Sequence, residues 1–178
     1  MREAVCIASG PSLRPIDCAR VRVWRDAGPA RGVVVTNNTF RLCPWSDALY
    51  AMDNEWWRVY GEEVRRTFEG ATYSRYGNYG TKPVLQHGRN SGAGALLLAA
   101  QLGAKRILML GYDCKGNKHW HANHKKPLGN CESQLRWPEY FRKAKDLLAG
   151  VEVINCTEGT ALDVFPLGEL AHELSIAE

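Results

Sequence analysis

Three of the five histidines in this chain lie within the six-residue segment His119–His124 (His-Trp-His-Ala-Asn-His). An imidazole titrates near neutrality, so His121 or His124 could deprotonate a hydroxyl as a general base. The cations Lys125, Lys126 and Arg136 follow, and together with a histidine they could bind a phosphate group.

A metal site is a third interpretation of the same segment, with Asp113 or Cys114 as further ligands. The spacing matches no zinc motif, and we expect the histidine side chains of this segment to diverge. A solvent-exposed polar loop would also have this composition. We rank catalysis or phosphate binding first and expect no resident metal, because the segment follows a strand whose tip should face a cleft.

Two small polar turns have the composition of phosphate-binding loops. The apolar run 4–8 (Ala-Val-Cys-Ile-Ala) predicts a strand, and a glycine-containing turn separates it from a predicted helix. The second turn, residues 88–94, precedes an apolar helix whose first N–H groups could attract an anion. A turn needed only for packing would look the same. The candidate ligand-binding residues in the two turns are Ser9, Gly10, Pro11, Ser12, Ser91 and Gly92.

Polar residues also follow two other apolar runs. Asn37 and Asn38 come after the run 32–36, where their amides could contact the edge of a base or sugar, or simply favour a turn. Tyr112 and Asp113 follow the run Ile107–Leu110. We expect Asp113 to orient the catalytic histidine or a ribose, since open α/β sheets bind ligands at the carboxyl ends of their strands.

Short apolar runs alternate with helical patterns along the whole chain, which favours a mainly parallel sheet. We therefore predict an α/β fold: a single Rossmann-like nucleotide-binding domain over residues 1–178, with helices on both faces of the sheet. A long functional loop is expected at about 114–136. The predicted strands are 4–8, 32–36, 47–52, 107–110 and 151–155, with one or two more within 70–86. The predicted helices are 15–27, 54–66, 95–102, 137–148 and 167–175.

Charge, hydropathy and cysteine content limit which kinds of function and cellular compartment we expect. The net charge of +4 is mild and no basic run is concentrated, so nucleic-acid binding is possible but not favoured. No stretch is long and apolar enough to span a bilayer, and no signal peptide is recognisable. The six cysteines are scattered without a C-x-x-C pair. We expect reduced thiols and a cytoplasmic protein, in the host cell if the gene is phage-encoded.

The segment Ile7–Leu13 resembles the "GxGPSL" signature of the bacterial sialyltransferases of glycosyltransferase family 42. Ser91-Gly92, the apolar helix and the following Leu102–Asp113 segment resemble a second motif of that family. The archaeal 6-hydroxymethyl-dihydropterin pyrophosphokinases share the "GPSL" loop and the glycine-x-aspartate pattern. Small phage-encoded proteins of unassigned role share both features and are the most similar in length.

The resemblance implies a Rossmann-like fold that binds a nucleotide where the strand order reverses. It implies that Asn37 or Asn38 contacts the nucleotide, that His121 or His124 is the general base, and that Tyr112 is the nearest match to the tyrosines that assist the departing phosphate. The first function hypothesis is a transferase, glycosyltransferase-like, that uses a nucleoside-activated and possibly CMP-linked donor and requires no further cofactor.

Two other hypotheses stay open. One is a pyrophosphokinase-type transferase that needs Mg²⁺, with Asp113 and Asp53 as the candidate carboxylates. The other is a non-enzymatic phage protein that binds a nucleotide or a partner. The expected partners are a nucleotide or nucleotide-sugar and an unknown acceptor, with no membrane, and a homo-oligomer is possible.

Overall fold

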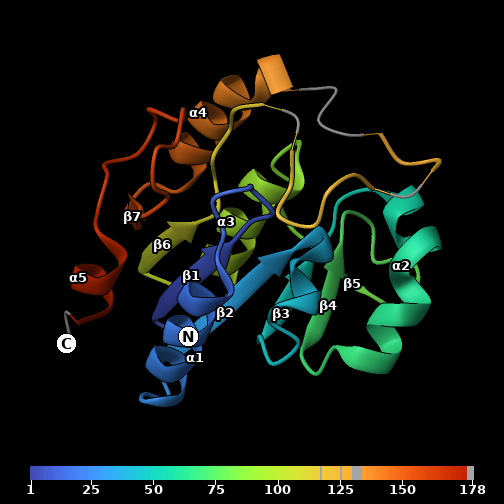
Figure 1. Cartoon of the computed structure of the whole chain (residues 1–178), viewed down its shortest axis with the longest axis horizontal. Helices are drawn as coiled ribbons and strands as arrows, with labels where there is room; N and C mark the ends of the chain where they lie inside the picture. Colours follow the sequence, from blue (N-terminus) through green and yellow to red (C-terminus); the bar gives the residue numbers. More distant parts are fainter. Residues whose placement is uncertain (117, 125, 130–133, 176–178) are drawn as a thin grey trace.

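A single seven-stranded sheet forms the centre of the protein (Figure 1). The computed structural model describes residues 1–116, 118–124, 126–129 and 134–175. The strand order is β5-β4-β3-β2-β1-β6-β7, and every paired strand is parallel to its neighbour. This confirms the predicted α/β Rossmann-like class. The strands are β1 Glu3–Ile7, β2 Arg31–Thr36, β3 Ala48–Tyr50, β4 Ala71–Ser74, β5 Lys82–Pro83, β6 Arg106–Leu110 and β7 Glu152–Asn155.

Strand β1 lies in the middle of the sheet, where Val5 pairs with Val33 of β2 and with Leu108 of β6. All five residues of β1 are buried. A parallel strand covered on both faces buries its alternate side chains in two different cores, so it reads as a continuous apolar run. For this reason the short apolar runs in the sequence predicted the central strands correctly.

Helices cover both faces of the sheet. The side chains of α1, α2 and α5 pack with Val5, Ile7 and Val33 on one face, and those of α3 and α4 pack with Cys6 and Val34 on the other. The helices are α1 Pro15–Asp26, α2 Asn54–Thr67, α3 Ser91–Gln101, α4 Trp137–Leu147 and α5 Leu170–Ser175, with short 3₁₀ turns η1 Asn37–Arg41 and η2 Gln134–Arg136.

Helix α3 is apolar on nearly every face because the sheet and α4 cover it from opposite sides, and eight of its residues are buried. Gly103 follows its C-terminus with φ of +100°, the backbone conformation that the sequence predicted for this glycine. On α2, Trp56, Trp57 and Tyr60 are buried, as expected of packing residues.

Two further sequence predictions concern segments of irregular structure. Residues 70–86 contain two short strands, β4 and β5, as expected. Lys125 and Cys131 lie outside the described residues. No disulfide joins the described cysteines Cys6, Cys18, Cys43, Cys114 and Cys156.

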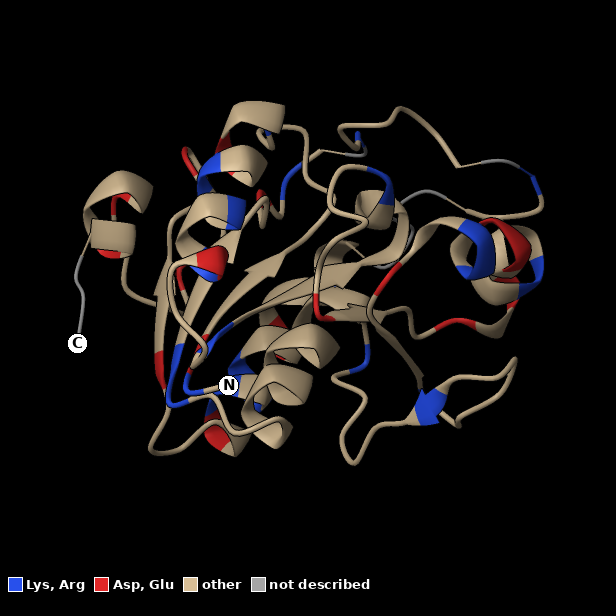
Figure 2. Ribbon diagram, turned by 90° about the horizontal axis from the view of Figure 1, so that it is seen from below, with Lys and Arg blue, Asp and Glu red and all other residues tan. Residues whose placement is uncertain are grey.

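Charges of both signs are spread over the molecule. Figure 2 shows Lys and Arg beside Asp and Glu on α2 and on α4. Within the described part of the chain, no helix is both long and apolar enough to cross a membrane.

Candidate functional site

A cavity of about 390 Å³ opens at the carboxyl ends of the strands. It lies where the strand order reverses: the chain runs from β1 outward through β2 to β5 and returns to the other side of β1 with β6. The loops that leave β1 and β6 therefore diverge at this point and leave a crevice between them. The start of α3 and the ends of β2 and β3 complete the wall. We call this the main cavity.

The loop after β1, residues 8–14, is held in place by Asp113 at the end of β6. The backbone N–H and the hydroxyl of Ser12 donate to the two carboxylate oxygens of Asp113, at 3.1 and 2.8 Å. The N–H of Gly10 donates to the carbonyl of Gly111 at 2.9 Å. Asp113 is buried, so these charge-assisted bonds are little screened by solvent. In the described structure the hydrogen bonds of its carboxylate go to this loop and not to a histidine, so the Asp113 side chain positions the β1 loop.

The first turn of α3 presents backbone N–H groups to the cavity. Asn90 caps the helix, and its side-chain oxygen accepts from the N–H of Ala93 at 2.7 Å. In the described part of the chain the N–H groups of Ser91 and Gly92 make no hydrogen bond, and both residues line the cavity. Free N–H groups at a helix N-terminus, together with the helix dipole, are the features that favour an anion at such a position.

Most of the residues singled out from the sequence meet at this cavity. Those that line it are Ser9, Gly10, Pro11, Asn37, Ser91, Gly92, Tyr112, Asp113 and His124. Ser12, Asn38 and His121 are not among the described residues that line it. Tyr112 is buried, packs edge-on against Phe141 and donates to the carbonyl of Gly92 at 3.2 Å, so it also supports the first turn of α3.

Of the two adjacent asparagines, only Asn37 faces the cavity. Its φ of +46° turns the backbone there, in a region that asparagine tolerates better than most residues. Asn38 is buried, and its side-chain oxygen accepts from the indole N–H of Trp56 at 2.8 Å. Asn38 therefore packs under the site, and its amide nitrogen lies 3.5 Å from Nδ1 of His121.

Sequence reasoning did not name as candidates the polar residues Arg89, Asn90, Lys115 and Lys118, which also line the cavity. His119, from the histidine segment, lines it too. Arg89 has φ of +65° and directly precedes the cap of α3. Its position next to an anion-attracting turn was the signal that could have identified it. Asp53, which we assigned to Mg²⁺, lines the cavity at the end of β3, and burial raises the pKa of its carboxyl, against the lowering effect of Arg75.

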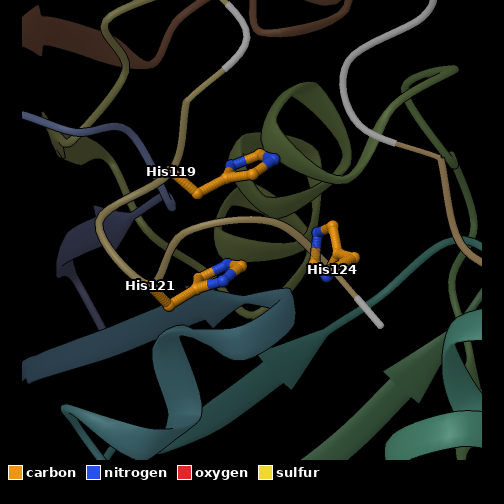
Figure 3. Close-up of side chains that lie close together, drawn as sticks. All are labelled: His119, His121 and His124. Carbon is orange, nitrogen blue, oxygen red and sulfur yellow. The ribbon is translucent and has the colours of Figure 1, made fainter. Parts of the chain in front are cut away.

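The three imidazoles of His119, His121 and His124 converge (Figure 3). We call them the histidine cluster. Their ring centres are 5.0, 5.0 and 4.9 Å apart, and one nitrogen of each ring lies within 4.8 Å of the other two. Our expectation that these side chains diverge was wrong, because residues two apart share a face even in an extended strand, and a turn brings His124 to the other two. Ala122 has φ of +64°, and its N–H donates to the carbonyl of His119 at 3.2 Å, which closes a turn.

The turn is fixed to the rest of the site through Trp120. Its backbone N–H donates to the carbonyl of Ser9 at 3.2 Å, and its indole N–H reaches Oγ1 of Thr39 at 3.4 Å. The indole ring packs edge-on against His121, with ring centres 5.2 Å apart. The histidine cluster is therefore held against the β1 loop, and His119 and His124 form part of the cavity wall.

Burial lowers the pKa of all three imidazoles. Burial, with smaller contributions from the neighbouring histidines and Arg41, lowers the pKa to about 3 for His121 and to about 4 for His124. For His119 burial lowers the pKa, while a hydrogen bond to the backbone of Ser9 opposes the shift. All three rings are therefore neutral at pH 7. An imidazole with so low a pKa is a weak general base, because proton acceptance is most efficient when the pKa is near the working pH.

These lowered pKa values predict a specific loss of stability in acid. An unfolded histidine binds a proton below about pH 6.5. Folded His121 and His124 do so only near pH 3 and 4, so the free energy of unfolding falls as the pH is lowered across this window. In chelator-treated protein, the unfolding temperature of a His121→Gln/His124→Gln variant should depend less on pH than that of the wild type. Parallel curves for the two proteins would show that the imidazoles contribute nothing.

The fold and the cavity define an open, parallel α/β protein with a crevice at the reversal of strand order, lined by two small polar turns and a histidine cluster. No protein-family model, curated protein or solved structure matches the chain in comparisons with each of these groups. The function must therefore be argued from the site itself.

Proposed function

We propose that this protein is a nucleotide-dependent transferase that binds a nucleoside-activated donor in the main cavity. One observation carries the proposal: the turn after β1, the start of α3 and the turn after β6 border the same cavity at the reversal of strand order. Parallel α/β sheets bind nucleotides at this place, with phosphates at a helix N-terminus. The volume of about 390 Å³ lies within the range of about 300–1,000 Å³ found for small-molecule sites.

The phosphates are assigned to the N–H groups of Ser91 and Gly92, with Arg89 and Lys118 as the nearby cations. These donors would stabilise the negative charge that develops on the departing phosphate. Asn37, at the end of β2, is assigned to the base or the ribose. The histidine cluster is assigned to the acceptor hydroxyl, to which a neutral imidazole nitrogen would offer a hydrogen-bond acceptor. As in the family 42 sialyltransferases that the sequence resembles, the transferred group would be a sugar.

A pyrophosphokinase-type transfer is the second candidate, because Asp53 and Asp113 both line the cavity. Both carboxylate oxygens of Asp113 already accept hydrogen bonds from Ser12, which leaves Asp53 as the better placed ligand for Mg²⁺. This candidate requires ATP and Mg²⁺ together, so a single set of measurements separates it from the first.

Thermal unfolding in the presence of nucleotides tests the proposal. CMP, CDP, UDP, GDP, ATP and CMP-sialic acid would each be added with Mg²⁺ and with a chelator. A ligand at about a hundred times its Kd that binds only the folded state adds roughly 2.7 kcal/mol, which raises the unfolding temperature measurably. We expect a metal-independent shift with a cytidine nucleotide. A shift only with ATP and Mg²⁺ would favour the second candidate, and no shift with any nucleotide would contradict both.

Arg89→Ala should weaken binding of the nucleotide that gives the shift by about tenfold or more, since a hydrogen bond to a charged group contributes about 1.5–3 kcal/mol. The affinity of the corresponding nucleoside should stay the same, because it lacks the phosphate. Arg66→Ala is the matched control: Arg66 is an exposed arginine on α2 that does not line the cavity. Equal nucleotide affinities for Arg89→Ala and Arg66→Ala would contradict the assignment of the phosphates to the start of α3.

A further inference from the structure

We propose that the histidine cluster is a binding site for a divalent transition-metal ion such as Zn²⁺. His119, His121 and His124 provide three ligands, and the fourth position faces the main cavity. This inference goes beyond nucleotide binding and does not depend on it. Imidazole nitrogens suit Zn²⁺ and its neighbours in the first transition row, and not Mg²⁺, which prefers oxygen ligands.

The geometry of the three rings is close to that of a bound site. A tetrahedral ion with Zn–N bonds of about 2.0–2.1 Å holds its ligand nitrogens roughly 3.4 Å apart and its ring centres roughly 5 Å apart. The ring centres here are already 4.9–5.0 Å apart. The nitrogens lie within 4.8 Å of one another. The rings of His119 and His121 stack nearly parallel, at 5°, so at least one of them must turn about its Cβ–Cγ bond to point at a shared ion.

The surroundings also favour metal binding. Nε2 of His121 is buried and has no hydrogen-bond partner among the described residues. A buried polar atom without a partner is unfavourable, and a metal ion would satisfy it. His119 makes a hydrogen bond to the backbone of Ser9. Metal-ligating histidines commonly donate their second ring N–H to a backbone carbonyl, which fixes the ring and leaves the other nitrogen for the metal.

The positive charge of Arg41, which lies near the cluster, is compensated. Arg41 acts on His121 and His124. Its guanidinium makes two hydrogen bonds of 2.6 Å with the carboxylate of Glu63, so its charge is largely neutralised.

Three protein ligands leave a fourth position for water, as in catalytic zinc sites. His119 and His124 line the cavity, so this position faces the space assigned to the donor and acceptor. Zinc lowers the pKa of its bound water to about 7. The bound water, rather than a weakly basic imidazole, would then be the proton-accepting group of the site.

The test is Zn²⁺ binding to the full-length, chelator-treated protein, measured by equilibrium dialysis and by the unfolding temperature. We expect one Zn²⁺ per chain and a rise in unfolding temperature that a chelator reverses. His119→Gln, His121→Gln and His124→Gln should each weaken binding at least about tenfold, since even groups that only hydrogen-bond a ligand change metal affinity about 10–100-fold. His172→Gln, on the exposed side of α5, is the matched control and should bind as the wild type does.

X-ray absorption at the zinc edge of the wild-type complex tests the site without any variant that could fail to fold. Three imidazole nitrogens are expected. Thiolate ligands, a variant without all three histidines that binds Zn²⁺ as tightly as the wild type, or no stoichiometric binding would each overturn the proposal. The nucleotide measurements in chelator are independent of the metal. If no nucleotide binds while Zn²⁺ does, only the nucleotide proposal is contradicted. If a nucleotide binds while Zn²⁺ does not, only the proposed metal site is contradicted.

Discussion

Arg106→Ala should lower the free energy of unfolding by about 3–5 kcal/mol, the range expected when one partner of a buried ion pair is removed. Arg106 begins β6, and only 13% of its side chain is exposed. Its guanidinium donates to Glu3 of β1 at 3.3 Å, to Glu152 of β7 at 3.1 Å and to Glu173 of α5. The substitution would remove the counterion of Glu173 and leave Glu3 with Arg31, whose Nε lies 3.6 Å away.

Urea unfolding of the wild type, Arg106→Ala and Arg106→Lys measures this effect. Lysine keeps the charge but cannot bond to several carboxylates through one planar group, so its loss should be intermediate. Glu152→Gln is the control, because 59% of the Glu152 side chain is exposed and a surface pair contributes about 0–1 kcal/mol. A loss below about 1 kcal/mol for Arg106→Ala would mean that the network stabilises nothing.

The fold could be predicted because its strongest signals are local. Buried parallel strands such as β1 and β6 are continuous apolar runs, and Gly103 marks the end of α3 by its own backbone preference. Once the strands are known to be parallel, their carboxyl ends must lie at one edge of the sheet. The convergence of the β1 loop, the start of α3 and the end of β6 on one cavity follows from that topology alone.

The roles of individual residues within the site could not be predicted, because they depend on contacts between distant parts of the chain. Ser12 and Asp113 are 101 residues apart, and no local pattern indicates that they bind each other. Asn37 and Asn38 are identical in type and adjacent, and only the positive φ of Asn37 decides which one faces the cavity.

The turn that forms the histidine cluster could not be predicted from the sequence either. The turn that brings His119, His121 and His124 together has Ala122 in the left-handed region, where glycine or asparagine is the expected residue. With alanine at this position, the sequence gives no turn signal and an extended segment is the natural interpretation. The backbone strain at Ala122 is offset by the contacts of Trp120 with Ser9 and Thr39, which again link distant parts of the chain.

Gly10→Ala should abolish nucleotide binding and lower the free energy of unfolding by about 2–4 kcal/mol, through overpacking and the loss of charge-assisted hydrogen bonds. A Cβ atom at position 10 would lie 2.8 Å from Cγ of Asp113, and closer still to its Oδ2 and to the carbonyl oxygen of Gly111. The loop and Asp113 must then separate, which breaks both hydrogen bonds from Ser12. The clash therefore displaces the turn that borders the cavity, and binding fails even where the fold survives.

Two variants separate this local effect from a general effect of alanine. Gly61→Ala on α2 places its Cβ at ordinary distances, 3.5 Å from Arg65 and 3.8 Å from Trp57, and should stabilise the helix by about 0.5–1 kcal/mol. In a Gly10→Ala/Asp113→Ala double variant, the clash with the carboxylate is gone while the hydrogen bonds from Ser12 stay broken. Its stability loss should therefore be smaller than the sum of the two single losses. If the two stability losses simply add in the double variant, Gly10 and Asp113 do not act on the same contact. The β1 loop would then be positioned by something other than the carboxylate of Asp113.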